Sequence, residues 1–291
     1  MTSVTPYIKN QTQKIRQLMS KWFPGYIRKS YFKELDQAIA QFPEKVLTPE
    51  NEILFISELI PKNATVLDIG ANKGIYVYAL NKSKKCKEIH ALEPIPELNR
   101  QLKNLFPGIK VYNEAISDIT GKHQFRIPYI NSRYFDTRGT LESYTESEQT
   151  GTRTIEVETI SLDQFILKYE IQNVDLIKMD IEGHEYAALS GAINTLKNLR
   201  PVWLIEIEQR HHANLPIRDI FSFIEKFDYR GYYFDGILHQ FLPIIDFKTH
   251  ILQLMENMNI KEKYINNFLF VPAEKDKEFT EIFYKISKQF K

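Results

Sequence analysis

The sequence predicts an α/β fold in which a doubly wound, mostly parallel sheet is covered by helices on both faces. Apolar, β-branched runs alternate with stretches of helical spacing along most of the 291 residues, which is typical of parallel strands joined by helices. The predicted strands are 66–69, 89–92, 111–116, 176–179 and 202–207, then a hairpin at 232–242 and a last strand at 268–271. The predicted helices are 74–81, 95–105, 184–196, 217–227 and 249–257.

Composition and charge exclude several other classes of protein. The 38 basic and 37 acidic side chains leave a formal net charge of +1, so no overall field attracts nucleic acid, and we predict no nucleic-acid partner. The single cysteine, Cys86, excludes an intramolecular disulfide and indicates a reducing compartment. We find no apolar run near the roughly 18 residues that span a bilayer and no signal-peptide pattern, so we expect a cytoplasmic protein. Nothing indicates an oligomeric state.

Four segments differ in pattern. Residues 1–47 read as an N-terminal helical extension, with an amphipathic, basic stretch at 1–24 and a second helix at 31–42. The stretch at 1–24 suits either a peripheral membrane or partner contact or packing on its own domain. The main domain is predicted at 48–275, opening with a helix start at Thr48-Pro49-Glu50. Within it, 122–159 breaks the alternation and reads as a substrate lid or a disordered loop, and 276–291 form a C-terminal helix.

A glycine-rich turn at 66–74 (VLDIGANKG) marks a nucleotide-sized binding corner. Gly70 and Gly74 permit close backbone approach, and the amides that open the next helix offer donors. The turn is neither the dinucleotide Gly-x-Gly-x-x-Gly nor a phosphate loop, so a phosphate-free nucleoside such as S-adenosylmethionine fits better. Glu93, at the end of the second strand, is placed to accept the ribose hydroxyls, and Asp68 to lie near the cationic methionine end.

Five sequence blocks resemble one family. They are VLDIGANKGIYVYAL at 66–80, LEP at 92–94, NEAISDITG at 113–121, TISLD at 159–163 and VDLIKMDIEGHEYAALSGA ending at 192. Together they resemble the FkbM-type S-adenosylmethionine-dependent methyltransferases over about 64–272. The resemblance implies a Rossmann-like class I methyltransferase fold with a mostly parallel, seven-stranded sheet. It also implies O-methylation of a hydroxyl on a sugar, a glycan or a polyketide-like small molecule.

Further cofactor contacts are predicted around the corner. We assign cofactor binding to Ala71, Asn72, Tyr76 and Pro94 in addition to the residues above. Ser117, which follows the third strand, is expected at the adenine edge.

A second polar block follows the strand at 176–179 and opens a helix, so its side chains belong to the carboxyl edge of the sheet, where ligands bind in such folds. Asp180 is predicted to lie near the sulfonium or the acceptor. Glu182 and His184 are candidates to orient the acceptor or take its proton. An alternative is that the acids only stabilise the first helical turn electrostatically.

Strand alternation places Glu206 and Glu208 on one side of the strand at 202–207, and we count Glu206 among the catalytic candidates. Asp180, Glu182, Glu206 and His211 include enough oxygen ligands for a hard cation, but no ligand spacing supports one, and we predict no metal. The adjacent His211 and His212 fit a solvated loop equally well.

The predicted lid is rich in aromatic and polar side chains that suit a sugar ring. They are Tyr129, Asn131, Arg133, Tyr134, Phe135, Arg138, Ser143 and Tyr144. Two alternatives to a methyltransferase remain at this point: a nicotinamide-dependent oxidoreductase on the same architecture, and a non-catalytic module that binds a membrane or partner through 1–24.

Overall fold

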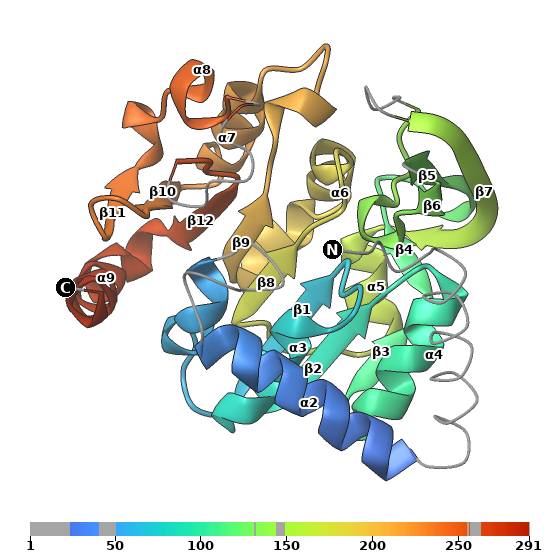
Figure 1. Ribbon diagram of the computed structural model, residues 1–291. Coiled ribbons are helices and arrows are strands. Elements are labelled where there is room, and N and C mark those ends of the chain that lie inside the picture. Colours follow the sequence, from blue (N-terminus) through green and yellow to red (C-terminus); the bar gives the residue numbers. More distant parts are fainter. Residues whose placement is uncertain are drawn as a thin grey trace, which may run out of the picture.

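The computed structural model describes residues 24–40, 51–130, 132–143, 149–254, 256 and 263–290. Its centre is an eight-stranded sheet (Figure 1). In spatial order the strands are β11 (Gln240–Pro243), β10 (Tyr229–Asp235), β12 (Asn267–Pro272), β9 (Val202–Glu206), β8 (Leu176–Met179), β1 (Ala64–Ile69), β2 (Cys86–Leu92) and β3 (Lys110–Tyr112). The stretch 1–23, with its predicted amphipathic helix, lies outside the described residues.

The strands β9, β8, β1, β2 and β3 are parallel to one another, and β12, β10 and β11 extend the sheet with antiparallel pairs. This arrangement confirms the predicted mostly parallel α/β sheet. The sheet has eight strands rather than the seven that the family resemblance implies, and the hairpin predicted at 232–242 supplies two of them, β10 and β11. Every residue of β1, β8 and β12 is buried, as expected for strands covered on both faces.

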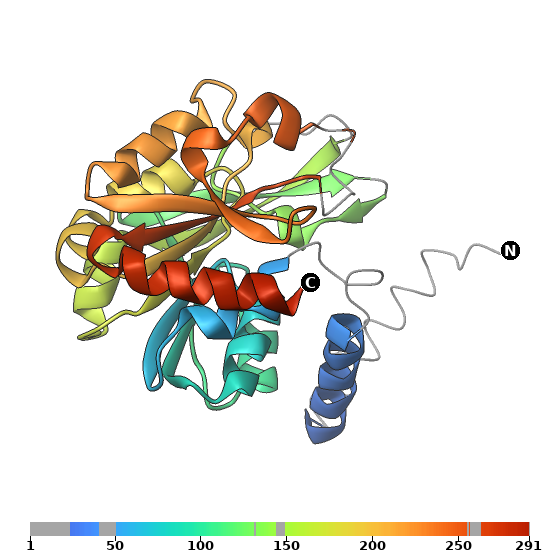
Figure 2. The ribbon, with the colours of Figure 1, turned by 90° about the vertical axis from the view of Figure 1, so that its left-hand side faces the viewer.

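Helices cover both faces of this sheet. One face carries η1 (Asn51–Leu54), η2 (Ile56–Leu59), α3 (Ile75–Ser83) and α9 (Asp276–Gln289), with α9 in red in Figure 2. The opposite face carries α5 (Leu162–Lys168), α6 (Glu185–Ser190) and α7 (Ile217–Glu225). Helices α2 (Pro24–Ala40) and α4 (Pro96–Leu105) pack against α3 in a third apolar cluster.

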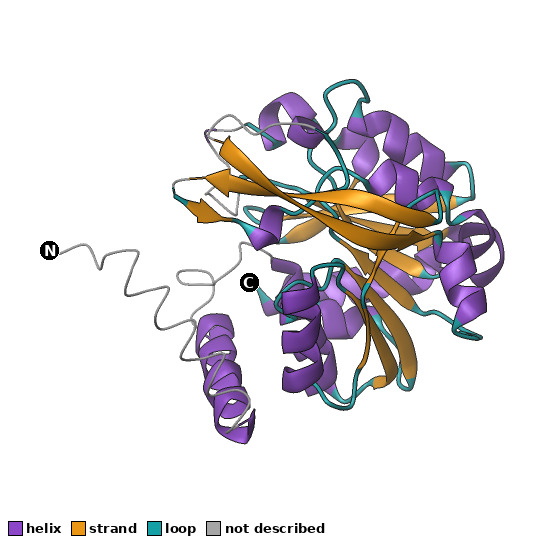
Figure 3. Cartoon of the chain, turned by 90° about the vertical axis from the view of Figure 1, so that its right-hand side faces the viewer, coloured by secondary structure: helices purple, strands orange, loops and turns teal. Residues whose placement is uncertain are grey.

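A second sheet lies beside the first (Figure 3). Its strands are β4 (Glu114–Ile116), β7 (Gln149–Ile160), β5 (Gly121–Ile130) and β6 (Arg133–Tyr134). The single strand predicted at 111–116 is therefore wrong. The chain leaves the main sheet at Asn113, whose side-chain amide donates to the carbonyls of Glu93 and Pro94 at 2.9 and 2.8 Å. The described part of the predicted lid consists mainly of the long antiparallel strands β5 and β7.

Two predicted helices are interrupted. After the undescribed Thr48-Pro49-Glu50, the chain forms η1 and η2 instead of one α-helix, since the ring of Phe55 between them is buried against Phe234 and Phe241. The helix predicted at 184–196 ends at Ser190, and the Gly191 carbonyl accepts from the Asp163 amide at 3.1 Å instead of continuing the helix. The chain resumes as a π-helical segment, η4 (Thr195–Leu199).

The remaining elements are short. They are η3 (Asp136–Arg138), η5 (Gln209–His211), η6 (Ile244–Asp246), η8 (Ala273–Lys275) and α8 (Thr249–Leu252). Helix α8 stops well before the predicted end at 257, and α5 was not predicted. Helix α9 lies where the tail helix is expected, and the domain boundaries stay predictions. None of the described helices is long and apolar enough to cross a membrane.

Candidate active site

A cleft opens at the carboxyl edge of the main sheet and is closed on one side by the second sheet. It encloses about 530 Å³ including its open mouth. Strands β1 and β8 are neighbours there although they are more than a hundred residues apart, and the Asp180 amide donates to the Ile69 carbonyl at 3.0 Å. The lining residues are Ile69, Gly70, Asn72, Glu93, Pro94, Ile95, Glu114, Ala115, Ile116, Phe125, Asp136, Thr137, Gly139, Leu141, Asp180, Ile181, Glu182 and His184.

The two glycines of the predicted corner are required by the packing of the protein itself. Gly70 has a φ of +82°, and a Cβ built on it would lie 1.8 Å from the Asp180 carbonyl oxygen. Gly74 has a φ of +80°, and its Cβ would lie 2.6 Å from the side chain of Leu102 and 2.8 Å from Phe106. The sequence predicts that a ligand approaches these two glycines closely. In the structure the loop between β8 and α6 packs against Gly70, and α4 packs against Gly74.

Glu93 is buried at the base of the cleft. Its Oε2 accepts from the Asn72 amide and its Oε1 from the Ile95 amide, both at 2.8 Å. Burial raises the pKa of this carboxyl to about 8. Each carboxylate oxygen has two lone pairs, so each can accept one further hydrogen bond from a hydroxyl group while keeping its hydrogen bond to the backbone amide.

Asn72 lines the cleft next to Glu93. It adopts a left-handed φ of +48°, which asparagine tolerates better than most residues. Its buried Oδ1 has no hydrogen-bond partner within the described part of the chain. An unsatisfied acceptor next to Glu93 suits a nucleoside that presents hydroxyl or amino donors.

The other predicted cofactor residues lie behind the cleft wall. Asp68, Ala71, Gly74, Tyr76 and Ser117 are buried and do not line the cleft. Asp68 on β1 is the register partner of Lys178 on β8. The Lys178 ammonium lies 5.0 Å from the centre of the Tyr76 ring and donates to Asn267 Oδ1 at 3.3 Å. Asp68, Tyr76, Lys178 and Asn267 form a buried polar layer beneath the site.

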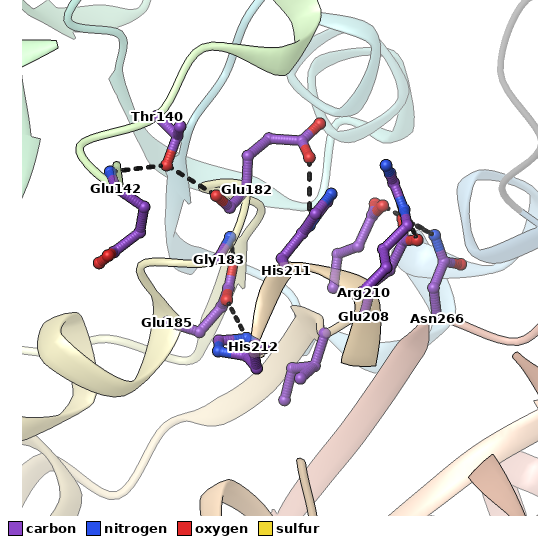
Figure 4. A network of polar contacts seen from close by, with 12 residues as sticks. Thr140, Glu142, Glu182, Gly183, Glu185, Glu208, Arg210, His211, His212 and Asn266 are labelled. Carbon is purple, nitrogen blue, oxygen red and sulfur yellow. Dashed lines mark hydrogen bonds and ion pairs between the residues drawn. The ribbon is translucent and has the colours of Figure 1, made fainter. Parts of the chain in front are cut away.

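Asp180 and Glu182 face the cleft from the loop after β8. Glu182 has a φ of +53°, a conformation that costs energy for a residue with a side chain and that often marks a functional position. Burial, reinforced by the charge of Asp180, raises the pKa of Glu182 well above its ordinary value. Its Oε2 lies 3.4 Å from His211 Nδ1 (Figure 4), and burial together with Arg210 lowers the pKa of His211 to about 4.

His184 connects this loop to the second sheet. Its Nδ1 lies 2.6 Å from Glu142 Oε1 and its Nε2 lies 2.9 Å from Ser117 Oγ. Beside it, the Thr140 hydroxyl donates to the Glu182 carbonyl at 2.7 Å (Figure 4). Both ring nitrogens of His184 therefore bind protein groups, and in this conformation the residue ties the loop after β8 to Glu142 and Ser117 rather than facing the cleft with a free nitrogen.

Glu206 stands outside the cleft lining. It accepts from Asn266 Nδ2 at 2.7 Å, and the same amide lies 3.3 Å from Glu208, so both glutamates do face one side of the chain. Burial raises the pKa of Glu208, but Arg210 more than offsets this effect and lowers the pKa to about 2. The Arg210 Nε donates to Glu208 Oε2 at 2.5 Å.

The two adjacent histidines are buried, not solvated. His211 faces Glu182, and His212 Nε2 lies 2.9 Å from Glu185 Oε2. No group of three or more acidic, histidine or cysteine side chains in the described ranges is arranged to hold a metal ion.

The side chains predicted to contact a sugar from the segment 122–159 differ from those that line the cleft. The described members of the predicted set do not line the cleft; Asn131 and Tyr144 lie outside the described residues. Arg133 and Arg138 instead stack on Phe135, at 4.2 and 5.4 Å from its ring centre. The second sheet contributes Phe125 of β5 and the three residues of β4 to the cleft, and the segment between β6 and β7 contributes Asp136, Thr137, Gly139 and Leu141. Alternation along 121–130 was the available signal, because it buries Phe125 and Ile127 on the inward face.

Three features meet at one edge of this sheet: a glycine turn after the first strand, an acid after the second strand and an acidic loop after β8. Together they define an S-adenosylmethionine-dependent methyltransferase. Residues 68–231 match the model of the methyltransferase FkbM domain. The chain belongs to this family, and the nicotinamide-dependent alternative is set aside.

Two relatives have named activities. The chain is 24% identical over 218 residues to the 2-O-methyltransferase NoeI of Sinorhizobium fredii, covering 70% of this chain and 90% of that protein. It is 26% identical over 175 residues to the hexuronic acid methyltransferase AglP of Haloferax volcanii, covering 59% and 65%.

Solved structures with a similar arrangement include the methyltransferase FkbM from Methylobacillus flagellatus, with a TM-score of 0.47 and 18% identity over 86% of this chain and 60% of that one. Another is an O-methyltransferase from Bacillus cereus in complex with SAH, with a TM-score of 0.40 and 13% identity over 88% and 96% of the two chains.

Proposed function

We propose that this methyltransferase acts on a hydroxyl of a sugar, of a glycan or of a similar polyhydroxylated small molecule. The observation that carries the proposal is a single cleft with two chemically different walls. Glu93 and Asn72 offer acceptors for a nucleoside on one wall, and Asp180 and Glu182 face the same space from the other. The relatives named for 2-O-methyl transfer and for hexuronic acid methylation support this acceptor class.

The donor is held by the first wall. Glu93 would accept the ribose hydroxyls and Asn72 Oδ1 a further donor group, and from the opposite wall the carboxylate of Asp180 would offset positive charge. When bound, S-adenosylmethionine supplies an electrophilic methyl group for in-line displacement. The protein then has to align an acceptor oxygen and remove its proton.

Glu182 is the residue that we assign to the acceptor proton. Burial, reinforced by the charge of Asp180, raises its pKa, and a carboxylate whose pKa is raised takes up a proton more readily. The neutral His211 at 3.4 Å supports its carboxyl group. His184, bound to Ser117 and Glu142, keeps the second sheet closed over the acceptor.

Calorimetry with S-adenosylhomocysteine tests the donor wall. We expect the native protein to bind it and Glu93→Ala to lose at least about tenfold in affinity, which is the effect of removing a pair of hydrogen bonds. Glu158→Gln, at an exposed position on β7, is the matched control and should bind normally. No binding by the native protein, or full binding by Glu93→Ala, would contradict the donor assignment.

Labelled methyl transfer tests the acceptor wall. Native protein incubated with a panel of glycosides should label at least one sugar hydroxyl. Glu182→Gln should keep S-adenosylhomocysteine binding and lose about a hundredfold or more in turnover, as is typical for removal of a general base. Normal turnover by Glu182→Gln would exclude it as the base, and labelling confined to amines would refute O-methylation.

A further inference from the structure

Helix α2 lies before the residues that match the family model and makes a direct contact with the donor turn. The Tyr31 hydroxyl donates to the Lys73 carbonyl at 2.5 Å. Lys73 stands between Asn72 and Gly74, and the Asn72 amide is the one that binds Glu93. Burial raises the pKa of Tyr31 to about 12, so its hydroxyl keeps its proton at neutral pH.

The same face of α2 is anchored by apolar contacts. The Phe32 ring stacks on Phe106 at 5.4 Å between centres and lies 4.9 Å from Tyr78. Leu35 is only 2% exposed and shares an apolar cluster with Ala71 of the turn. Phe106 is also one of the side chains that closes over Gly74. One aromatic ring thus contacts both α2 and the turn.

A polar contact fixes the next turn of α2. Asp36 forms an ion pair with Lys82 of α3. Hydrogen bonds from Lys82 and from Tyr78 lower the pKa of Asp36. Helix α2 is therefore bound to the donor turn through Tyr31, to Phe106 at the end of α4 through Phe32, and to α3 through Asp36.

We propose that α2 is a clamp that sets the affinity for the methyl donor, with Tyr31, Phe32 and Leu35 as positioning residues. This inference rests on the donor site proposed above. The turn contains a left-handed Asn72, and tying the next carbonyl to α2 removes other conformations before the donor arrives. A binding loop that is held in its bound conformation loses less entropy on binding. The clamp gives the N-terminal extension control over donor affinity.

Calorimetry with S-adenosylhomocysteine on the full chain tests the clamp. Tyr31→Phe keeps the ring and removes the bond to Lys73, and we expect its affinity to fall about three- to tenfold, the effect of one hydrogen bond. Asp36→Asn is a second variant that loosens α2 without changing the turn, and it should weaken binding in the same direction. Ser30→Ala is the control, because the Ser30 hydroxyl contacts Glu34 of the same helix, and its affinity should equal that of the native protein.

Hydrogen–deuterium exchange separates positioning from a purely structural role. In Tyr31→Phe, amides within 70–78 should exchange faster while the core strands and the thermal midpoint stay unchanged. Native affinity in both Tyr31→Phe and Asp36→Asn overturns the inference, as does weaker binding in Ser30→Ala of equal size. Failure of the native protein to bind S-adenosylhomocysteine is a different result, because it overturns the donor site and this inference with it.

Discussion

The proposed donor turn and the proposed acceptor side of the cleft are built in different ways. The donor turn is made by backbone: Gly70 packs on the Asp180 carbonyl, and Glu93 is held by two main-chain amides. The acceptor side is made by side chains that bond across long stretches of chain, such as His184 with Ser117, 67 residues away, and Thr140 with the Glu182 carbonyl, 42 residues away.

This difference decides how each region responds to change. A backbone-built turn tolerates many side chains but fails when a Cβ is forced into it, because the main chain has no rotamer to move away. A wall built from side-chain bonds loses one contact at a time, at about the value of a hydrogen bond each. The predictions below test this contrast, beginning with the largest effect.

Gly70→Ala should cause the largest loss. The added Cβ would lie 1.8 Å from the Asp180 oxygen, at a φ of +82°, so both overpacking and backbone strain apply. We expect the free energy of unfolding to fall by about 3 kcal/mol or more, measured by urea unfolding, with loss of S-adenosylhomocysteine binding. Gly108→Ala is the matched control, since its Cβ meets nothing within 4 Å. Equal stability of the two variants would refute a backbone-built turn.

His184→Ala should have an intermediate effect on the acceptor side. The imidazole is mostly buried, and its loss removes the contacts to Glu142 and Ser117. We expect a loss of about 2 kcal/mol in the free energy of unfolding, as for a hydrogen bond to a charged group, and faster hydrogen–deuterium exchange within 132–143.

The control for the loss of the His184 contacts is Lys122→Ala on the outer side of β5. Its ion pairs with Glu156 and Glu158 are exposed, and exposed pairs contribute little, so no measurable change is expected. Unchanged exchange within 132–143 in His184→Ala would show that the second sheet closes the cleft without this residue.

The pH dependence of donor binding should show the smallest effect. With its pKa at about 8, Glu93 is mostly protonated at pH 7 and ionised at pH 9. Methylthioadenosine carries the ribose diol without the amino-acid part, and it should bind up to about tenfold more tightly at pH 9 than at pH 7. Titration calorimetry on the native protein and Glu93→Gln measures this. The same dependence in Glu93→Gln would assign it to another group.

Glu93 also links pH to stability, with a defined sign. Its pKa in the folded chain, about 8, lies above the value of about 4.3 for an unperturbed glutamate. Its contribution to stability is therefore complete below the unfolded value and is lost as the pH rises through 8. Donor binding to the ionised form offsets part of this loss, because a ligand that binds the folded state stabilises it.

The sequence predicts those elements that depend on local pattern. The strand at 176–179 coincides with β8, and the corner at 66–74 lies between β1 and α3 as expected. Strand Val111 to Ile116 could not be divided in advance, because its break at Asn113 is set by bonds to Glu93 and Pro94 of another segment. For the same reason Asp136 and Thr137 were missed, since only the folding of β5 and β7 brings them to the cleft.

The sequence by itself determined the α/β class, the glycine corner at 66–74 and the acidic loop after β8, because strand alternation, glycine turns and short motifs are encoded by neighbouring residues. The tertiary structure alone decided whether each predicted side chain lines the cleft or is buried beneath it. It placed Asp68 and Tyr76 in a buried layer, Glu93 in the cleft and both nitrogens of His184 against protein groups. Those outcomes depend on packing between segments far apart in the chain, for which no local pattern exists.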